Sequence, residues 1–212
     1  MSASDRCVRI DAAHVTPESL RAAADWLARG GVVAYPTDTF YGLAVDASSA
    51  DAVEALFDVK GRDPSMAMPL IAASREQVET RIGPLTGGSA LLADTFWPGP
   101  LSLILDAPAW VAPAVHGGLG TIAIRVPADP IARALCLAWG SPITATSANR
   151  SGAPPAFDVT MLARLDDDRR VFVVDGGATP GGQPSTLVDA RGPEWRCLRA
   201  GAIAWDRVLT SR

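Results

Sequence analysis

The stretch VVAYPTDTFYGLAVD, residues 32–46, carries the pattern that decides the fold class. Its first four residues are apolar and prone to β-structure, and so are most of those from Tyr41 to Asp46, which predicts two short buried strands. Thr37, Asp38 and Thr39 lie in the turn between them and offer hydroxyl and backbone groups to a small ligand. The same residues are typical of a tight turn in which Thr and Asp satisfy only the backbone, and on this segment alone the turn is the better interpretation.

Helical and strand-like patterns alternate on both sides of this stretch. Pro17 predicts the start of a helix that ends at the glycine pair 30–31, and further helices are expected from about Asp51, after Ser74 and from Asp129. Further strands are expected at Pro69–Ala72, Leu101–Leu105, Thr121–Val126, Ile143–Thr146, Val171–Val174, Thr186–Asp189 and Trp195–Leu198. Because the spacing is too irregular for strict βαβ winding, the pattern predicts an α/β fold with a twisted mixed sheet flanked by helices.

The composition is that of an ordinary globular protein. Of the 212 residues, 48% are hydrophobic and 20% are charged, and no low-complexity segment divides the chain. We therefore expect a single domain over residues 1–212, with one sizeable core. The longest apolar region, residues 101–115, is broken by Ser102, Asp106 and two prolines, so no membrane-spanning helix is expected.

The numbers of cysteines and histidines and the net charge argue against a secreted disulfide protein, a zinc protein and a nucleic-acid-binding protein. The first residues carry no secretory pattern, and the three cysteines form no Cys-x-x-Cys pair, which favours a reducing cytoplasmic location. Two histidines leave little from which to build a zinc site. The formal net charge of −4 argues against binding nucleic acid by bulk electrostatics, although a local basic cleft stays open as an alternative.

Lys60 is the single lysine among 19 basic residues. It ends a predicted helix and is followed by Gly61 and Arg62. Two cations at the C-terminal end of a helix commonly complement the helix dipole. The functional alternative is a clamp on phosphate oxygens, with Lys60 as a compact charge and Arg62 as a planar fork.

Two more polar segments follow predicted strands. Residues 144–152 contain Ser147-x-Asn149, which suits phosphate or ribose contacts but also a loop or a helix cap. The glycine-rich run 176–182, before Ser185, would let backbone amides approach an anion or would simply form turns. The sequence contains no Gly-x-x-x-x-Gly-Lys-Ser/Thr loop, no dinucleotide fingerprint and no Gly-x-Ser-x-Gly elbow.

The order and combination of these segments resemble the YrdC/Sua5 family, the threonylcarbamoyl-adenylate synthases. The matching motifs span about residues 10–204, in the family's order: Tyr35–Leu43, Lys60–Arg62 with Pro69-Leu70, Trp97–Leu101, Thr121–Pro127, Ser147–Asn149 with Ser151-Gly152, Ser185-Thr186 and Leu198–Gly201. The resemblance implies a YrdC-like twisted sheet whose concave face forms one large, positively charged pocket. Sua5 proteins proper carry a second C-terminal domain, and this chain resembles the short, single-domain form.

The resemblance also implies site residues. ATP would be bound by Lys60, Arg62, Ser65, Thr121, Ser147, Asn149 and Arg199. L-Threonine would be held by Thr37, Arg125 and Ser185, with Arg125 paired to its carboxylate. Lys60 and Arg62 would be the catalytic residues.

The implied reaction joins L-threonine, bicarbonate and ATP into threonylcarbamoyl-adenylate, with release of pyrophosphate, for the t6A modification of tRNA. Such nucleotidyl transfer needs aligned substrates and compensated charge rather than a protein nucleophile, with Mg²⁺ carried on ATP as the only cofactor. The expected partners are these small molecules and a t6A transferase complex that receives the product, with at most weak contact to tRNA and none to a membrane.

Two departures from the family pattern leave particular substrate contacts open. Met66–Met68 stand where the family often has a polar or basic residue, and Pro154-Pro155 stand where it tends to have Ser. The alternative functions are an RNA-binding module that uses the same cleft, a domain like that of hydrogenase-maturation carbamoyltransferases, and a paralogue with another carbamoylation substrate.

Overall fold

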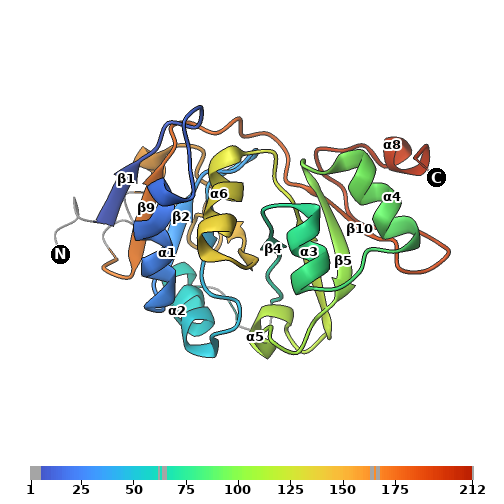
Figure 1. Ribbon diagram of the computed structural model, residues 1–212, viewed down its shortest axis with the longest axis horizontal. Helices are drawn as coiled ribbons and strands as arrows, with labels where there is room; N and C mark the ends of the chain where they lie inside the picture. The colour runs from blue at the N-terminus through green and yellow to red at the C-terminus, as the bar shows by residue number, and fades with distance from the viewer. Residues whose placement is uncertain (1–5, 62, 64–65, 163–164, 166–167, 212) are drawn as a thin grey trace.

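The computed structural model describes residues 6–61, 63, 66–162, 165 and 168–211. Among these residues the strands form two mixed sheets, one of five strands and one of six, and helices pack against both (Figure 1). β1 lies at one end of the long axis and α8 at the other. The predicted α/β class and mixed strand directions are confirmed, whereas the one sheet expected is divided into two.

The first sheet contains the strand–turn–strand stretch and has the order β1-β9-β2-β3-β8. Its strands are β1 (Cys7–Arg9), β2 (Val32–Tyr35), β3 (Gly42–Ala44), β8 (Thr146–Ser147) and β9 (Val171–Asp175). Val32 and Ala34 of β2 pack in one apolar cluster, and Val33 and Tyr35 pack in another on the opposite face. A strand covered on both faces has no place for a polar side chain, which explains its continuous apolar run.

The second sheet has the order β11-β10-β5-β6-β4-β7. Its strands are β4 (Leu70–Ile71), β5 (Leu101–Asp106), β6 (Thr121–Arg125), β7 (Ile143–Thr144), β10 (Thr186–Asp189) and β11 (Arg196–Arg199). Leu103 pairs with Ile124 across the antiparallel β5–β6 ladder, and both belong to the core. Their neighbours Ser102 and Arg125 alternate to the opposite face, which therefore carries the polar groups.

The helices begin at side-chain caps where the sequence offers them. They are α1 (Arg21–Ala28), α2 (Ala50–Lys60), α3 (Arg75–Arg81), α4 (Gly87–Phe96), α5 (Pro113–His116), α6 (Pro130–Trp139) and α8 (Trp205–Leu209), with 3-10 turns at Glu18–Leu20 and Val159–Leu162. Ser49, Ser74 and Asp129 each accept a hydrogen bond from a backbone N–H of the first turn. Pro17 precedes a 3-10 turn rather than the α-helix itself, which is a correction to the predicted start.

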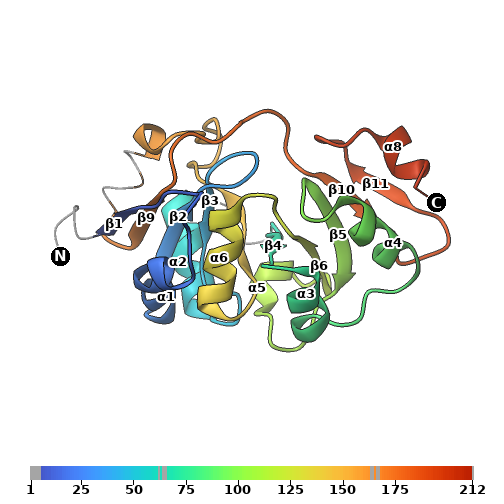
Figure 2. The same cartoon turned by 45° about the horizontal axis from the view of Figure 1, so that its top comes forward.

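The two sheets meet at residues 143–147, of which Ile143–Thr146 was expected to form one strand. β7 pairs with β4 of the second sheet, and β8 pairs with β3 of the first. In Figure 2, β2 and β3 of the first sheet lie to the left of α6, and β4, β5 and β6 of the second sheet lie to its right. At the crossing, the Thr144 hydroxyl accepts from the backbone N–H of Val45 at 2.9 Å, and the N–H of Ala145 donates to the carbonyl of Pro69 at 2.8 Å. The chain is thus tied to both sheets where it changes from one to the other.

Candidate functional site

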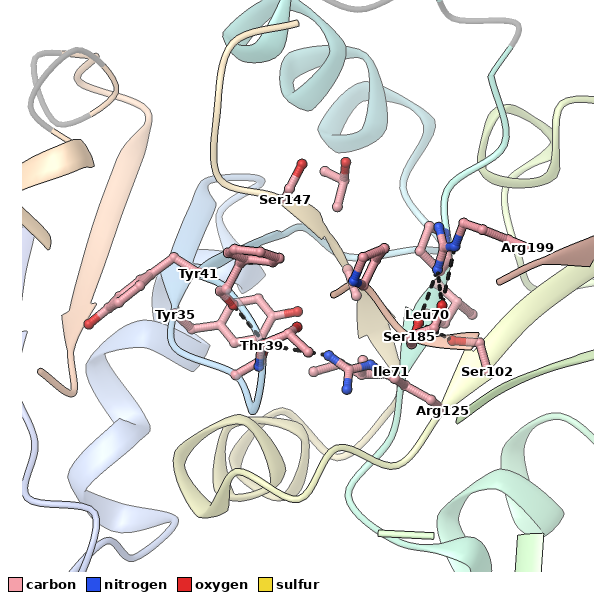
Figure 3. A pocket seen from close by; sticks show the side chains of 17 residues that line it. Tyr35, Thr39, Tyr41, Leu70, Ile71, Ser102, Arg125, Ser147, Ser185 and Arg199 are labelled. Carbon is pink, nitrogen blue, oxygen red and sulfur yellow. Dashed lines mark hydrogen bonds between the residues drawn. The ribbon is translucent and has the colours of Figure 1, made fainter. Parts of the chain in front are cut away.

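A pocket of about 240 Å³ lies where the two sheets meet (Figure 3). From the first sheet and its turn it is lined by Tyr35, Thr37, Thr39, Phe40, Tyr41, Gly42 and Ser147. From the second sheet and its flanking loops it is lined by Leu70, Ile71, Ser102, Arg125, Ser185 and Arg199. The fold therefore brings together five residues that the sequence singled out: Thr37, Arg125, Ser147, Ser185 and Arg199.

Thr37 and Arg125 meet across the junction of the sheets. The Thr37 hydroxyl donates to the Phe40 carbonyl at 2.7 Å and accepts from the N–H of Thr39 at 3.1 Å, so it does form the turn. The same oxygen lies 3.4 Å from Nη2 of Arg125, and Nη1 of Arg125 donates to Oδ1 of Asp38 at 2.6 Å. The segment is therefore both a tight turn and part of the pocket wall, so the structural and the ligand-binding interpretations are compatible.

A second polar cluster joins Ser102, Ser185 and Arg199. The Ser102 and Ser185 hydroxyl oxygens lie 2.8 Å apart, and Nη2 of Arg199 donates to the Ser185 hydroxyl at 3.0 Å and to its carbonyl at 2.8 Å. Burial, together with the nearby charge of Arg125, lowers the pKa of Arg199. Two arginines thus face one pocket, where an anionic ligand would relieve their repulsion.

Lys60 lies beneath the Ser147–Asn149 segment. Its Nζ donates to the carbonyl of Ser147, to the carbonyl of Asn149 at 2.9 Å and to Oδ1 of Asn149 at 3.3 Å. The Ser147 hydroxyl donates to the same Oδ1, and the N–H of Ser151 donates to the Lys60 carbonyl at 2.8 Å. Lys60 is 3% exposed and does not line the pocket, and its contacts support the loop that carries Ser147. Its predicted contact with ATP and its catalytic role stay predictions.

Three predicted ATP residues lie within the described part of the chain but do not line this pocket: Lys60, Asn149 and Thr121. Thr121 shares a face of β6 with Arg125 but lies about 13 Å further along the strand, beyond the lining residues. Arg62 and Ser65 lie outside the described residues.

Several residues of the site were not singled out from the sequence. Tyr41 donates from its hydroxyl to the Gly177 carbonyl at 2.7 Å and accepts from the N–H of Gly176 at 3.2 Å, which ties the glycine-rich run to the pocket. Burial raises the pKa of Tyr41 to about 12, so its phenol stays protonated. Ser102 could have been recognised from the sequence, because its hydroxyl lies between two leucines of a predicted buried strand.

Gly42 is required by close approach. A Cβ at this position would lie 2.9 Å from the ring and hydroxyl of Tyr35, which lines the same pocket. A side chain at position 42 would therefore overlap the buried Tyr35 ring and displace it, which explains the glycine here.

The Met66–Met68 departure is partly explained by packing. Met68 is 1% exposed in the core, and its N–H donates to the Val115 carbonyl at 2.8 Å, whereas Met66 is 54% exposed. Within the described part of the chain, no group of three or more His, Cys, Asp or Glu side chains is arranged to hold a metal ion. No helix of the described residues has the length and apolar character needed to cross a membrane.

Comparison with known proteins identifies the family of the chain. The sequence model of the family Sua5_yciO_yrdC, described as Telomere recombination, matches residues 25–201. The threonylcarbamoyl-AMP synthase of Bacillus subtilis is 38% identical over 193 residues, which cover 91% of this chain and 56% of that protein. The threonylcarbamoyl-AMP synthase of Halorhodospira halophila is 39% identical over 175 residues, which cover 82% of this chain and 92% of that protein.

The solved structures give the same result for the fold. The structure of P. abyssi Sua5 complexed with L-threonine matches with a TM-score of 0.87 and 33% identity, over 97% of this chain and 59% of that one. The chain thus spans little more than half the length of some relatives and nearly all of another. With the family model matched over most of its length, the chain belongs to the Sua5/YciO/YrdC family.

Proposed function

We propose that this chain is a nucleotidyltransferase that condenses L-threonine, bicarbonate and ATP into threonylcarbamoyl-adenylate, releasing pyrophosphate and water. The observation that carries the proposal is the pocket at the sheet junction, where two arginines and six serine or threonine side chains converge. Relatives named threonylcarbamoyl-AMP synthase support it, because they are similar over most of this chain.

The pocket suits the amino acid best. Its volume of about 240 Å³ lies below the roughly 300–1,000 Å³ typical of pockets that enclose larger ligands. We assign Arg125 to the threonine carboxylate, with Thr37 and Ser185 as hydroxyl partners on either side. Arg199 and Ser147 then face the phosphates, and the rest of ATP extends towards Asn149 and Thr121.

The chemistry asks for alignment and charge compensation. The threonine amine adds to the carbon of bicarbonate or CO₂ to form a carbamate, a carbamate oxygen attacks the α-phosphorus of ATP, and pyrophosphate leaves. The pocket's arginines would hold the anionic groups in line, which lowers the barrier without a covalent protein intermediate. Mg²⁺ would enter as part of the Mg-ATP substrate, and Arg62 and Ser65 remain proposed contacts of ATP.

The test is pyrophosphate release from Mg-ATP, with threonine and bicarbonate each supplied or omitted, and mass spectrometry of the quenched products. Release that requires both small substrates and yields threonylcarbamoyl-adenylate is the expected result. A matched control is Arg75→Ala, since Arg75 pairs with Glu79 and Asp94 on the surface and does not line this pocket. Absence of release with a folded chain would contradict the proposal and direct attention to RNA binding or another carbamoylation substrate.

The product would serve a second enzyme. A mixed anhydride of a carbamate and AMP is prone to hydrolysis, so we propose that a t6A transferase complex consumes it. Direct contact of this chain with tRNA is not required by the reaction.

A further inference from the structure

We propose that Asp38 determines which carboxylates Arg125 accepts. With Arg125 it forms a charge pair that favours a zwitterionic amino acid over a ligand that has a carboxylate but no ammonium group. This inference rests on the proposed amino-acid site and adds a specificity residue to it.

Asp38 and Arg125 form a buried ion pair in which Arg125 lines the pocket and Asp38 lies behind it. Oδ1 of Asp38 accepts from Nη1 of Arg125 at 2.6 Å, and the side chains are 12% and 10% exposed. Arg125 lines the pocket, and so does Thr37, whose hydroxyl oxygen lies 3.4 Å from Nη2 of Arg125. The acid therefore lies directly beside the cation that meets the ligand.

The pair changes what the pocket attracts. A lone guanidinium attracts any anion, and the proposed reaction brings bicarbonate and a triphosphate to the same pocket as threonine. A guanidinium with a carboxylate fixed beside it has no net charge, but the pair has a dipole. It therefore interacts best with a ligand whose positive and negative groups lie side by side in the opposite orientation. An α-amino acid presents such a pair, because its ammonium lies next to its carboxylate.

The second oxygen of Asp38 supports this role. Oδ2 is buried and has no hydrogen-bond partner in the described residues. Buried polar atoms normally have partners, so an exception calls for a reason in function. Holding Arg125 in place accounts for one oxygen of Asp38 only, and the remaining charge acts on whatever binds beside Arg125.

Asp129 offers a matched control. It is also close enough to interact electrostatically with Arg125 and Asp38, and burial raises its pKa. Its carboxylate caps α6 by accepting from the N–H of Ala132 at 2.9 Å. Like Asp38 it does not line the pocket, but among the described residues the ion pair of Arg125 is with Asp38 and not with Asp129. Asp129→Asn keeps a good cap and removes a carboxylate at the same location in the fold.

The experiment compares two ligands by NMR titration of the full chain: L-threonine and 3-hydroxybutanoate of matching configuration, which is threonine without its amino group. The wild type is expected to prefer threonine by about tenfold or more. In Asp38→Asn this ratio should fall at least fivefold, whereas in Asp129→Asn it should stay within twofold of the wild type. A ratio in Asp38→Asn equal to that of the wild type would overturn the proposal, because Asp38 would then act only as a support.

Two additions keep the outcome decisive. If Asp38→Asn does not fold by circular dichroism, Asp38→Ser gives the same ratio test with a residue common in turns. Adenylate formation is measured in parallel. If adenylate forms but the preference for threonine is the same in Asp38→Asn as in the wild type, this inference alone is refuted. If the preference depends on Asp38 but no adenylate forms, the proposed function alone is refuted.

Discussion

Lys60 and Arg125 are both buried cations near the junction of the two sheets, but they have opposite surroundings. Lys60, at the end of α2, donates to the carbonyls of Ser147 and Asn149 and to the amide oxygen of Asn149. Arg125, at the end of β6, faces the carboxylate of Asp38 and lines the pocket. The contacts of Lys60 hold a loop in place, whereas Arg125 lines a pocket and is proposed to bind the ligand carboxylate.

The largest expected effect is that of Arg125→Ala. The concentration of threonine needed for half-maximal pyrophosphate release should rise roughly 100-fold or more, because truncating a buried charge that binds a ligand carboxylate costs several kcal/mol. The free energy of unfolding should also fall by about 3–5 kcal/mol, since Asp38 is left buried and unpaired. Steady-state kinetics and urea unfolding measure the two effects.

The double variant Arg125→Ala with Asp38→Asn separates stability from binding. It should recover much of the unfolding free energy, because the unpaired charge is gone. It should not recover threonine binding. An unchanged threonine requirement in Arg125→Ala would show that the carboxylate binds elsewhere.

The second largest effect on activity is expected for Lys60→Met, which tests whether Lys60 supports the loop rather than binding phosphate. Removing the ammonium takes the donor from part-buried carbonyl oxygens of Ser147 and Asn149 and loosens their loop, so pyrophosphate release should fall by about 10- to 100-fold. If Lys60 holds the Ser147 loop, the affinities for adenosine and for ATP should fall by a similar factor. A selective loss for ATP, measured by calorimetry, would instead support direct contact with phosphate and break the comparison.

Ser102→Ala should have a smaller effect. The variant removes the partner 2.8 Å from the Ser185 hydroxyl, while Arg199 keeps its bonds to Ser185. One lost hydrogen bond is worth about 1 kcal/mol, so the threonine requirement should rise by roughly fivefold. Ser89→Ala is the matched control, since Ser89 is a similarly buried serine whose hydroxyl donates to the Thr86 carbonyl away from this pocket. An equal change in both variants would mean that the effect is general destabilisation.

The smallest expected effect on activity is that of Asp189→Asn, an acid of the second sheet outside the pocket. Ion pairs with Arg191 and Arg196 lower the pKa of Asp189 to about 2. Because this pKa is lower than in the unfolded chain, Asp189 stabilises the fold above about pH 4, and that stabilisation is lost as the pH falls through about 2.

The variant should therefore lose up to about 2 kcal/mol of unfolding free energy at neutral pH, with activity unchanged. The difference from the wild type should shrink between pH 4 and pH 2 in urea unfolding. A clear loss of activity at neutral pH would mean that Asp189 influences the site through its strand.

Most elements followed from local pattern. Val32–Tyr35 was expected as a strand because its residues are uniformly apolar, and α6 was expected because Asp129 and Pro130 mark its start and Gly140 its end. α4 was not predicted, since its glycine-rich start and weak amphipathic pattern resemble a loop. The division of residues 143–147 between two sheets was also missed, because strand pairing depends on partners distant in sequence.

The sequence by itself determined the family, the strand–turn–strand stretch and five of the polar residues that converge on the pocket, because these lie in short motifs whose character is local. Only the tertiary structure decided that Lys60 supports the Ser147 loop, that Ser102 joins Ser185, and that Asp38 pairs with Arg125. Asp38 and Arg125 are 87 positions apart in the chain. Their pairing follows from how two sheets meet, and side-chain contacts across such a junction depend on packing that no local pattern encodes.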